Sequence, residues 1–182
     1  MNISNRLQLI DYLSQGNQAK YLFFWGHTPA KGDNVDKSCF SQWYEQGFDI
    51  DGIHYRTAEH FMMAEKARLF HDDKVLDKVL NAKHPHEAKK LGRQVENFKE
   101  NIWQQHHFDI VVTANFAKFS QHSALKEFLL NTQQRILVEA SPVDKIWGIG
   151  LAADHLDAGN PYKWQGSNLL GFALMEVRHR LS

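Results

Sequence analysis

The chain has 182 residues, and its 21 basic side chains balance its 21 acidic ones. This balance excludes a strongly basic protein that would attract nucleic acid or anionic membranes over long range, although a local basic patch is compatible with it. The length suits one domain with its own hydrophobic core, and no window approaches the ~18 continuous apolar residues of a membrane span.

The single cysteine, Cys39, excludes an intrachain disulfide and favours a reducing compartment. The first residues lack the basic segment and apolar run of a secretory signal. We therefore expect a cytoplasmic protein with no membrane partner. The composition indicates nothing about its oligomeric state.

The first part of the chain is predicted to hold a helix over 4–14, a buried strand over 21–26, a loop over 27–46 and a hairpin over 47–55. The hairpin is indicated by alternating residues around Asp51-Gly52, a dipeptide typical of two-residue turns. Thr57 then caps a helix, and the dipole of that helix favours Glu59 in its first turn.

The remainder is predicted to hold helices over 72–80, 85–91, 98–122 and 124–131, strands over 135–141 and 145–150, a loop over 148–166, and a last helix over 168–181. The helix over 85–91 is well marked, with His84 as cap, Pro85 at its first position and Gly92 as its stop. The sum is an α+β protein, a predominantly helical single domain over 1–182 with a small β-sheet.

Two charged residues lie on the apolar stripe of the helix that follows Thr57. At about 100° and ~1.5 Å per residue, Glu59 and Lys66 point in nearly the same direction, about 10 Å apart along the axis. Met62, Met63 and Phe70 cluster around that direction. The pair is too far apart for an i,i+4 ion pair.

Two readings of this pair remain open. In the first, the Lys66 ammonium extends along the apolar surface to reach water, and Glu59 only complements the helix dipole. In the second, both groups face a cleft whose ligand fills the gap between them. Burial would then lower the pKa of the Lys66 amine and make it a nucleophile or proton carrier.

Two further candidate sites follow the strand over 135–141. Asp144 and Trp147 would be displayed by a loop, where a carboxylate beside an indole suits a sugar attached to a base, although Trp147 could equally pack in the core. Gly166 and Asn168 open the last helix, where free backbone N–H groups would meet an anion. An ordinary capped helix explains the same residues.

The eleven histidines do not form a metal motif, because no H-E-x-x-H or inverted form occurs. We interpret His84, His86, His106 and His107 as solvated or hydrogen-bonded side chains. Phosphate-binding loops of the GxxxxGK[ST] and GxGxxG kinds are absent, as is a G-x-S-x-G nucleophile motif. The sequence predicts no metal site and no cofactor.

Five ordered segments make the chain similar to the NADAR, or YbiA-like, family over about residues 23–180. They are FDIDGIHYRTAEHFMMAEKA, HPHEAKKLGR, NFAKF, LVEASPVDKIWGIGL and WQGSNLLGFALMEVR. The chain departs from the family at Ser41-Gln42-Trp43, where the family often has Ser-Asn-Phe.

The resemblance implies an N-glycosidase acting on ribose-linked amines, with a phosphorylated ribosylamine as substrate. One branch hydrolyses early intermediates of riboflavin biosynthesis and releases ribose 5-phosphate from a pyrimidine or uracil amine. Another removes ADP-ribose from guanine bases, and a non-catalytic module binding ADP-ribose or NAD is a third alternative. Nucleic acid is a partner only under the hypothesis that the protein removes ADP-ribose from guanine bases.

The resemblance also suggests roles for particular residues. Lys66 would attack or capture the ring-opened sugar, Glu59 would relay protons or hold a ribose hydroxyl, and Asp144 would be the other acid or base. The remaining candidates would bind substrate: Trp147 stacked on the base, Arg93, Lys118, Gly166 and Asn168 at the phosphate, and Gly148 without a more specific role.

Overall fold

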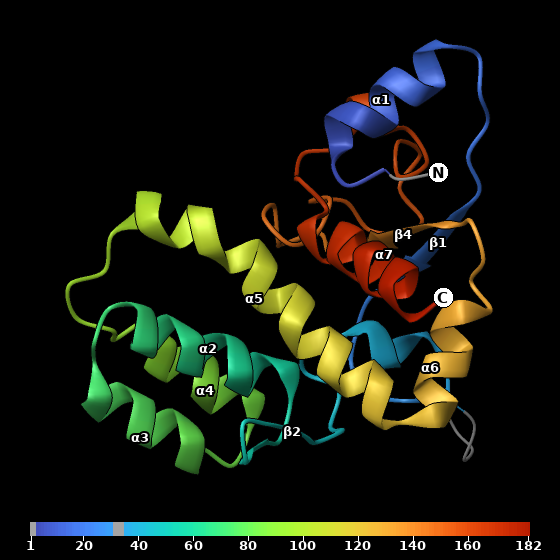
Figure 1. Ribbon diagram of the computed structural model, residues 1–182. Coiled ribbons are helices and arrows are strands. Elements are labelled where there is room, and N and C mark those ends of the chain that lie inside the picture. The colour runs from blue at the N-terminus through green and yellow to red at the C-terminus, as the bar shows by residue number, and fades with distance from the viewer. Residues whose placement is uncertain (1–2, 31–34) are drawn as a thin grey trace. The chain divides into compact units, whose positions relative to one another are not determined.

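The computed structural model describes residues 3–30 and 35–182, and the chain divides into two compact units (Figure 1). Unit 1 contains the residues up to Ser41 together with Ser123–Ser182, and unit 2 is the continuous segment Gln42–His122. The fold is α+β and predominantly helical, as predicted. The single-domain organisation expected from the sequence stays a prediction.

Unit 1 is built around two parallel strands that come from distant parts of the chain. Tyr21 lies opposite Ile136 and Phe24 opposite Glu139 in this pair. Helix α7 packs against β4, with its apolar side chains buried (Figure 1). The described elements of the unit are α1 (Arg6–Ser14), β1 (Tyr21–Phe24), η1 (Lys37–Phe40), α6 (Ser123–Leu130), β4 (Ile136–Glu139), η2 (Pro161–Lys163) and α7 (Leu169–Leu181).

The start of α7 satisfies the backbone of β4 with a side chain. The Asn168 amide donates from Nδ2 to the Leu137 carbonyl and accepts at Oδ1 from the Glu139 N–H, each at 2.9 Å. Asn168 adopts a left-handed conformation (φ 55°) to do so. One helical turn further, a Cβ at Gly171 would lie 2.0 Å from the Leu137 carbonyl oxygen. This contact requires glycine, because any side chain would push α7 away from the strand.

Unit 2 consists of a hairpin followed by four helices. The hairpin prediction is confirmed: Phe48 pairs with Tyr55, and Asp51 and Gly52 both take positive φ at the turn. Helix α2 packs against α3, α4 and α5 (Figure 1). The elements are β2 (Phe48–Ile50), β3 (Ile53–Tyr55), α2 (Ala58–Leu69), α3 (Asp73–Asn81), α4 (Pro85–Gly92) and α5 (Glu100–Gln121).

Some predictions about local structure are wrong. Residues 145–150 form turns rather than a strand, because their backbone groups bond to the start of α7 instead of to β4 along its length. The strand predicted over 21–26 ends at Phe24, and Trp25 is 58% exposed. The loop predicted over 27–46 contains η1, and its residues 31–34 lie outside the described residues. In the described part of the chain, no helix is long and apolar enough to cross a membrane.

We predict that Gly171→Ala destabilises the protein by about 3 kcal/mol or more, since the new methyl group would overlap a strand carbonyl that cannot move alone. Urea unfolding followed by circular dichroism measures the loss. The control is Gly159→Ala, where nothing lies within 4 Å of the added Cβ and a change below about 0.5 kcal/mol is expected. Equal stability of the two variants would contradict the packing described for α7.

Candidate active site

The first turn of α2 places Glu59 in a buried position. Thr57 has extended backbone angles, and its side-chain oxygen accepts the His60 N–H, as predicted for the cap. The N–H of Glu59 donates to the Gln42 carbonyl at 3.0 Å. The Glu59 side chain is only 2% exposed. The Glu59 carboxyl group is therefore removed from bulk water, and its facing a cleft shared with Lys66 stays a prediction.

Gln42 is itself held by the long helix α5. Asn115 donates from Nδ2 to Gln42 Oε1 at 2.7 Å and to the Val111 carbonyl at 2.9 Å. Both amide side chains are buried. Because Gln42 accepts from Glu59 through its backbone, α5 fixes the start of α2 through this amide pair. The sequence showed Gln42 only as a departure from the family pattern and did not indicate Asn115.

The Lys66 amine lies against two aromatic rings. Its Nζ is 4.1 Å from the centroid of the Phe98 ring and 5.6 Å from that of Trp103. Phe70 supports Phe98 with a ring-to-ring distance of 5.2 Å. The sequence correctly placed Phe70 near this face, but Phe98 and Trp103 were not anticipated because they approach from residues about 30 positions further along the chain.

Burial lowers the pKa of the Lys66 amine from its ordinary range. The nearby positive charge of Arg93 lowers this pKa further, and the negative charge of Glu100 opposes the effect. Lys66 is half-buried and Phe98 is 38% exposed. The amine therefore holds a larger neutral fraction near pH 7 than a solvated lysine does.

Arg93 and Lys118 lie in very different surroundings. Arg93 is exposed at the C-terminal end of α4, close enough to Lys66 to influence its charge. Lys118 is fully buried in α5, with Nζ 4.9 Å from the centroid of the Phe119 ring. A buried ammonium requires compensation by polar or anionic groups. Its predicted role in holding phosphate stays a prediction.

In unit 1, Asp144 organises the loop that follows β4. Its Oδ1 accepts from the N–H groups of Ile146 and Trp147 at 2.9 and 2.7 Å, and its own N–H donates to Ser141 Oγ. These bonds form a turn of the Asx kind, which orients Trp147. Trp147 is half-buried, so it is neither a core residue nor fully displayed.

The start of α7 differs from the anion site that was predicted. The N–H groups of Asn168, Leu169 and Leu170 donate to the carbonyls of Gly148, Ile146 and Trp147, respectively. They are therefore occupied by protein rather than directed at a ligand, and the geometric reason for a phosphate site here is wrong.

The two glycines of this region have a packing role. A Cβ at Gly166 would lie 2.3 Å from the Gly148 carbonyl oxygen, and one at Gly148 would lie 2.9 Å from the Glu139 carbonyl oxygen. Both glycines permit the loop to close against the strand and the helix start. Substrate binding by Gly148, Gly166 and Asn168 stays a prediction.

The predicted residues thus divide between the units. Glu59, Lys66, Arg93 and Lys118 belong to unit 2, and the others belong to unit 1. Among the described residues, no cluster of three or more histidine, cysteine, aspartate or glutamate side chains could hold a metal ion.

Comparison with known proteins identifies relatives along nearly the whole chain. The NADAR domain model matches residues 23–182. An N-glycosidase of Acanthamoeba polyphaga mimivirus is 43% identical, over 87% of this chain and 95% of that protein. N-glycosidase YbiA of Escherichia coli K12 is 31% identical, over 82% and 83%. The NMR structure of E. coli YbiA superimposes with a TM-score of 0.71 at 28% identity, covering 91% of this chain and 86% of that one.

We predict that folding stability falls as the pH is lowered below about 6.5, partly because of His60. Burial lowers the pKa of His60, whose ring nitrogens contact Thr57 Oγ1 and the Ala82 carbonyl. Below its ordinary value of 6.5, the unfolded chain therefore binds a proton that the folded chain does not. The contribution of neutral His60 to the free energy of unfolding is complete above pH 6.5. It decreases as the pH falls from 6.5 towards the lower pKa that His60 has in the folded chain.

Urea unfolding at several pH values between about 5 and 8 measures this dependence. The variant His60→Gln is expected to flatten the pH dependence of stability. The control variant His106→Gln, which changes an exposed histidine, should keep this dependence. Some slope should persist in His60→Gln, since burial also lowers the pKa of His107. An unchanged slope in His60→Gln would rule out the contribution of that ring.

Proposed function

The chain belongs to the NADAR domain family, and on this premise we propose that it cleaves ribose 5-phosphate from the exocyclic amine of a pyrimidine or uracil intermediate of riboflavin biosynthesis. Its broader activity follows from its curated relatives, which include N-glycosidases of a virus, an enterobacterium and the cyanobacterium Nostoc punctiforme. The protein is an N-glycosidase, a hydrolase of N-glycosyl compounds.

The observation that carries the proposed mechanism is the position of the Lys66 amine against Phe98 and Trp103. The anomeric carbon of a ribosylamine is a masked aldehyde, and neutral amines form imines with aldehydes. Because burial lowers the pKa of Lys66, a larger fraction of this amine is neutral near pH 7 than of a solvated lysine, and the neutral form carries out that reaction. The glycosidase geometry based on two carboxylates is not required by this route.

The proposed steps conserve atoms and charge. Opening of the ribose ring leaves an imine between C1 and the substrate nitrogen. The neutral Lys66 amine adds to C1, and one proton moves from Lys66 to the substrate nitrogen. A second proton follows the same path as the C1–N bond to the substrate breaks, so the substrate leaves as a free amine and Lys66 is left as an imine with C1. Water then adds to the C1–Lys66 imine and releases the aldehyde form of ribose 5-phosphate together with the lysine amine.

We assign the proton transfers to Glu59 before Asp144. Glu59 is buried and lies on the same helix as Lys66, two turns away. Asp144 already uses one oxygen to hold two backbone N–H groups of its own loop. Asp144 is the second candidate, and the variants Glu59→Gln and Asp144→Asn distinguish the two, since loss of the proton carrier lowers kcat about 10²–10⁴-fold.

The substrate assignment is supported by charge and by the side chains near Lys66. A formal net charge of zero suits a small metabolite better than a polynucleotide. Arg93 lies near Lys66, so we propose that it holds the phosphate. Lys118 is fully buried, and carbonyls occupy the N–H groups at the start of α7, so these groups are weaker candidates. Trp147 is proposed to stack on the base, and Gly148 is proposed as a further substrate-binding residue. A cytoplasmic location belongs to the same proposal.

We predict that Lys66→Met lowers hydrolysis by at least ~10³-fold while the protein stays folded, because methionine keeps the apolar stem and lacks the nucleophile. Released ribose 5-phosphate is measured with each riboflavin intermediate, and released ADP-ribose is measured with ADP-ribosylated guanine nucleotide. Lys90→Met, at an exposed position of α4, is the matched control and should retain full activity. Undiminished hydrolysis by Lys66→Met would refute the mechanism, and release from the guanine compound alone would refute the substrate.

The imine itself can be trapped. Borohydride added during turnover should attach one ribose phosphate to the protein, and peptide mass spectrometry should locate it on Lys66. The Lys66→Met variant should remain unlabelled under the same conditions. Labelling of that variant at the wild-type level would show that another amine reacts.

We predict that Trp103→Ala moves the acidic limb of the kcat/KM profile to higher pH. Removing the Trp103 ring exposes the Lys66 amine to water, so the pKa of Lys66 rises towards its ordinary value. Less neutral amine is then present at pH 7. The control is Trp25→Ala, an exposed tryptophan of unit 1. If the acidic limb of the kcat/KM profile did not move in Trp103→Ala, burial of the Lys66 amine by this ring would not set the pH dependence of catalysis.

A further inference from the structure

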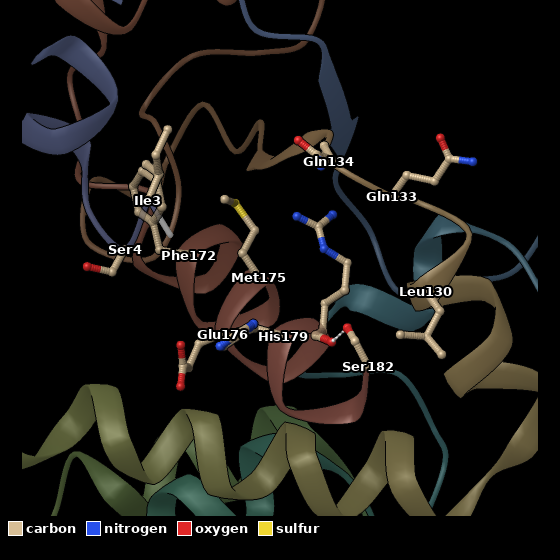
Figure 2. A pocket seen from close by; sticks show the side chains of 11 residues that line it. Ile3, Ser4, Leu130, Gln133, Gln134, Phe172, Met175, Glu176, His179 and Ser182 are labelled. Atoms are coloured by element: carbon tan, nitrogen blue, oxygen red, sulfur yellow. Dashed lines mark hydrogen bonds between the residues drawn. The ribbon is translucent and has the colours of Figure 1, made fainter. Parts of the chain in front are cut away.

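A pocket of about 290 Å³ lies within unit 1, beside the last turns of α7 and the segment 131–135 that joins α6 to β4. Figure 2 shows Ile3 and Ser4 on one side of it, Gln133, Gln134 and Leu130 on the other, and Met175 between them. None of the residues that line it belongs to the predicted catalytic or substrate-binding set. Its volume is close to the lower limit of ~300 Å³ for small-molecule sites.

Arg178 provides a fixed positive charge on the wall of this pocket. Its Nη1 donates to Thr132 Oγ1 at 2.7 Å and to the Arg135 carbonyl at 2.9 Å. These bonds hold the plane of the guanidinium. Nε and Nη2 make no hydrogen bond within the described part of the chain, so they keep their N–H groups for another partner.

The charge of Arg178 is not compensated by the surrounding protein. None of the ion pairs among the described residues includes Arg178, although the side chain is half-buried. The one side-chain carboxylate that lines the pocket, Glu176, pairs with Arg180 at 2.8 Å instead. Burial lowers the pKa of Arg178, and the adjacent charge of Arg135 lowers it further. An anion beside Arg178 would relieve both penalties.

The rest of the lining suits an anion with a short apolar part. Gln134 lies on the same side of the pocket as Gln133 and Leu130 (Figure 2), and its side-chain amide can donate a hydrogen bond. Phe172 and Met175 form an apolar wall and are 0% and 7% exposed. Gln133 takes positive φ (53°), a strained conformation that is common at ligand sites.

We propose that this pocket binds a small oxyanion, a phosphate monoester or a carboxylate, with Nε and Nη2 of Arg178 and the Gln134 amide as hydrogen-bond donors. A guanidinium offers a carboxylate or phosphate two parallel N–H groups, which a lysine cannot do. The site would sense a metabolite independently of the Lys66 chemistry, because it requires neither that residue nor its neighbours.

The test is a titration of the full-length protein, followed by NMR of side-chain N–H groups, with inorganic phosphate in one arm and acetate in the other. Saturable shifts of the Arg178 Nε–H and Gln134 amide signals with at least one anion are expected. Saturation with phosphate only would assign the site to phosphate monoesters, and with acetate only to carboxylates. If neither phosphate nor acetate produced a saturable shift, the proposal would be overturned.

Two variants make the test independent of folding. Arg178→Gln should abolish binding but also removes the bonds to Thr132 and Arg135. Gln134→Glu leaves those bonds intact and places a carboxylate beside the anion, so affinity should fall about tenfold or more. Gln18→Glu, an exposed change of the same charge in unit 1, should alter affinity less than about twofold. If Gln18→Glu and Gln134→Glu lowered the affinity for the anion equally, the loss would come from the added negative charge of the protein as a whole, and the proposed site would be refuted.

Discussion

Placing a lysine amine against aromatic rings removes part of its hydration, and the proposed chemistry depends on that cost. Desolvation destabilises the ammonium form more than the neutral amine, whereas the faces of Phe98 and Trp103 return part of the lost energy through cation–π attraction. Burial lowers the pKa of Lys66, and the amine is half-buried, so part of it still meets solvent.

This arrangement is useful only if α2 is held in one position. The cap by Thr57, the bond from Glu59 to the Gln42 backbone and the Gln42–Asn115 amide pair fix the start of the helix. Ring contacts from the chain before and within α5 fix its other end at Lys66. Both ends of α2 therefore depend on the segment 98–121, so Glu59 and Lys66 keep a constant spacing set by the helix itself.

Unit 1 is held together by close backbone packing around β4 and the start of α7. The amide of Asn168 satisfies β4, and Gly148, Gly166 and Gly171 permit approaches that a Cβ would block. The same bonds that make this region rigid occupy the N–H groups of α7 that were expected to bind phosphate. An Asn or Gly before a helix is therefore compatible with either use, and the neighbouring carbonyls decide between them.

The sequence by itself determined what depends on local periodicity and turn chemistry. It predicted the hairpin at Asp51-Gly52, the Thr57 cap, the α+β class and the position of Glu59 on the apolar stripe of its helix, because these follow from residues within a few positions of one another. Tertiary structure alone decided that Phe98 and Trp103 enclose Lys66, that Asn115 supports Gln42, and that carbonyls of 146–148 occupy the start of α7. These contacts join segments roughly 20 to 70 residues apart, and no periodic pattern in one segment specifies which distant side chain will meet it.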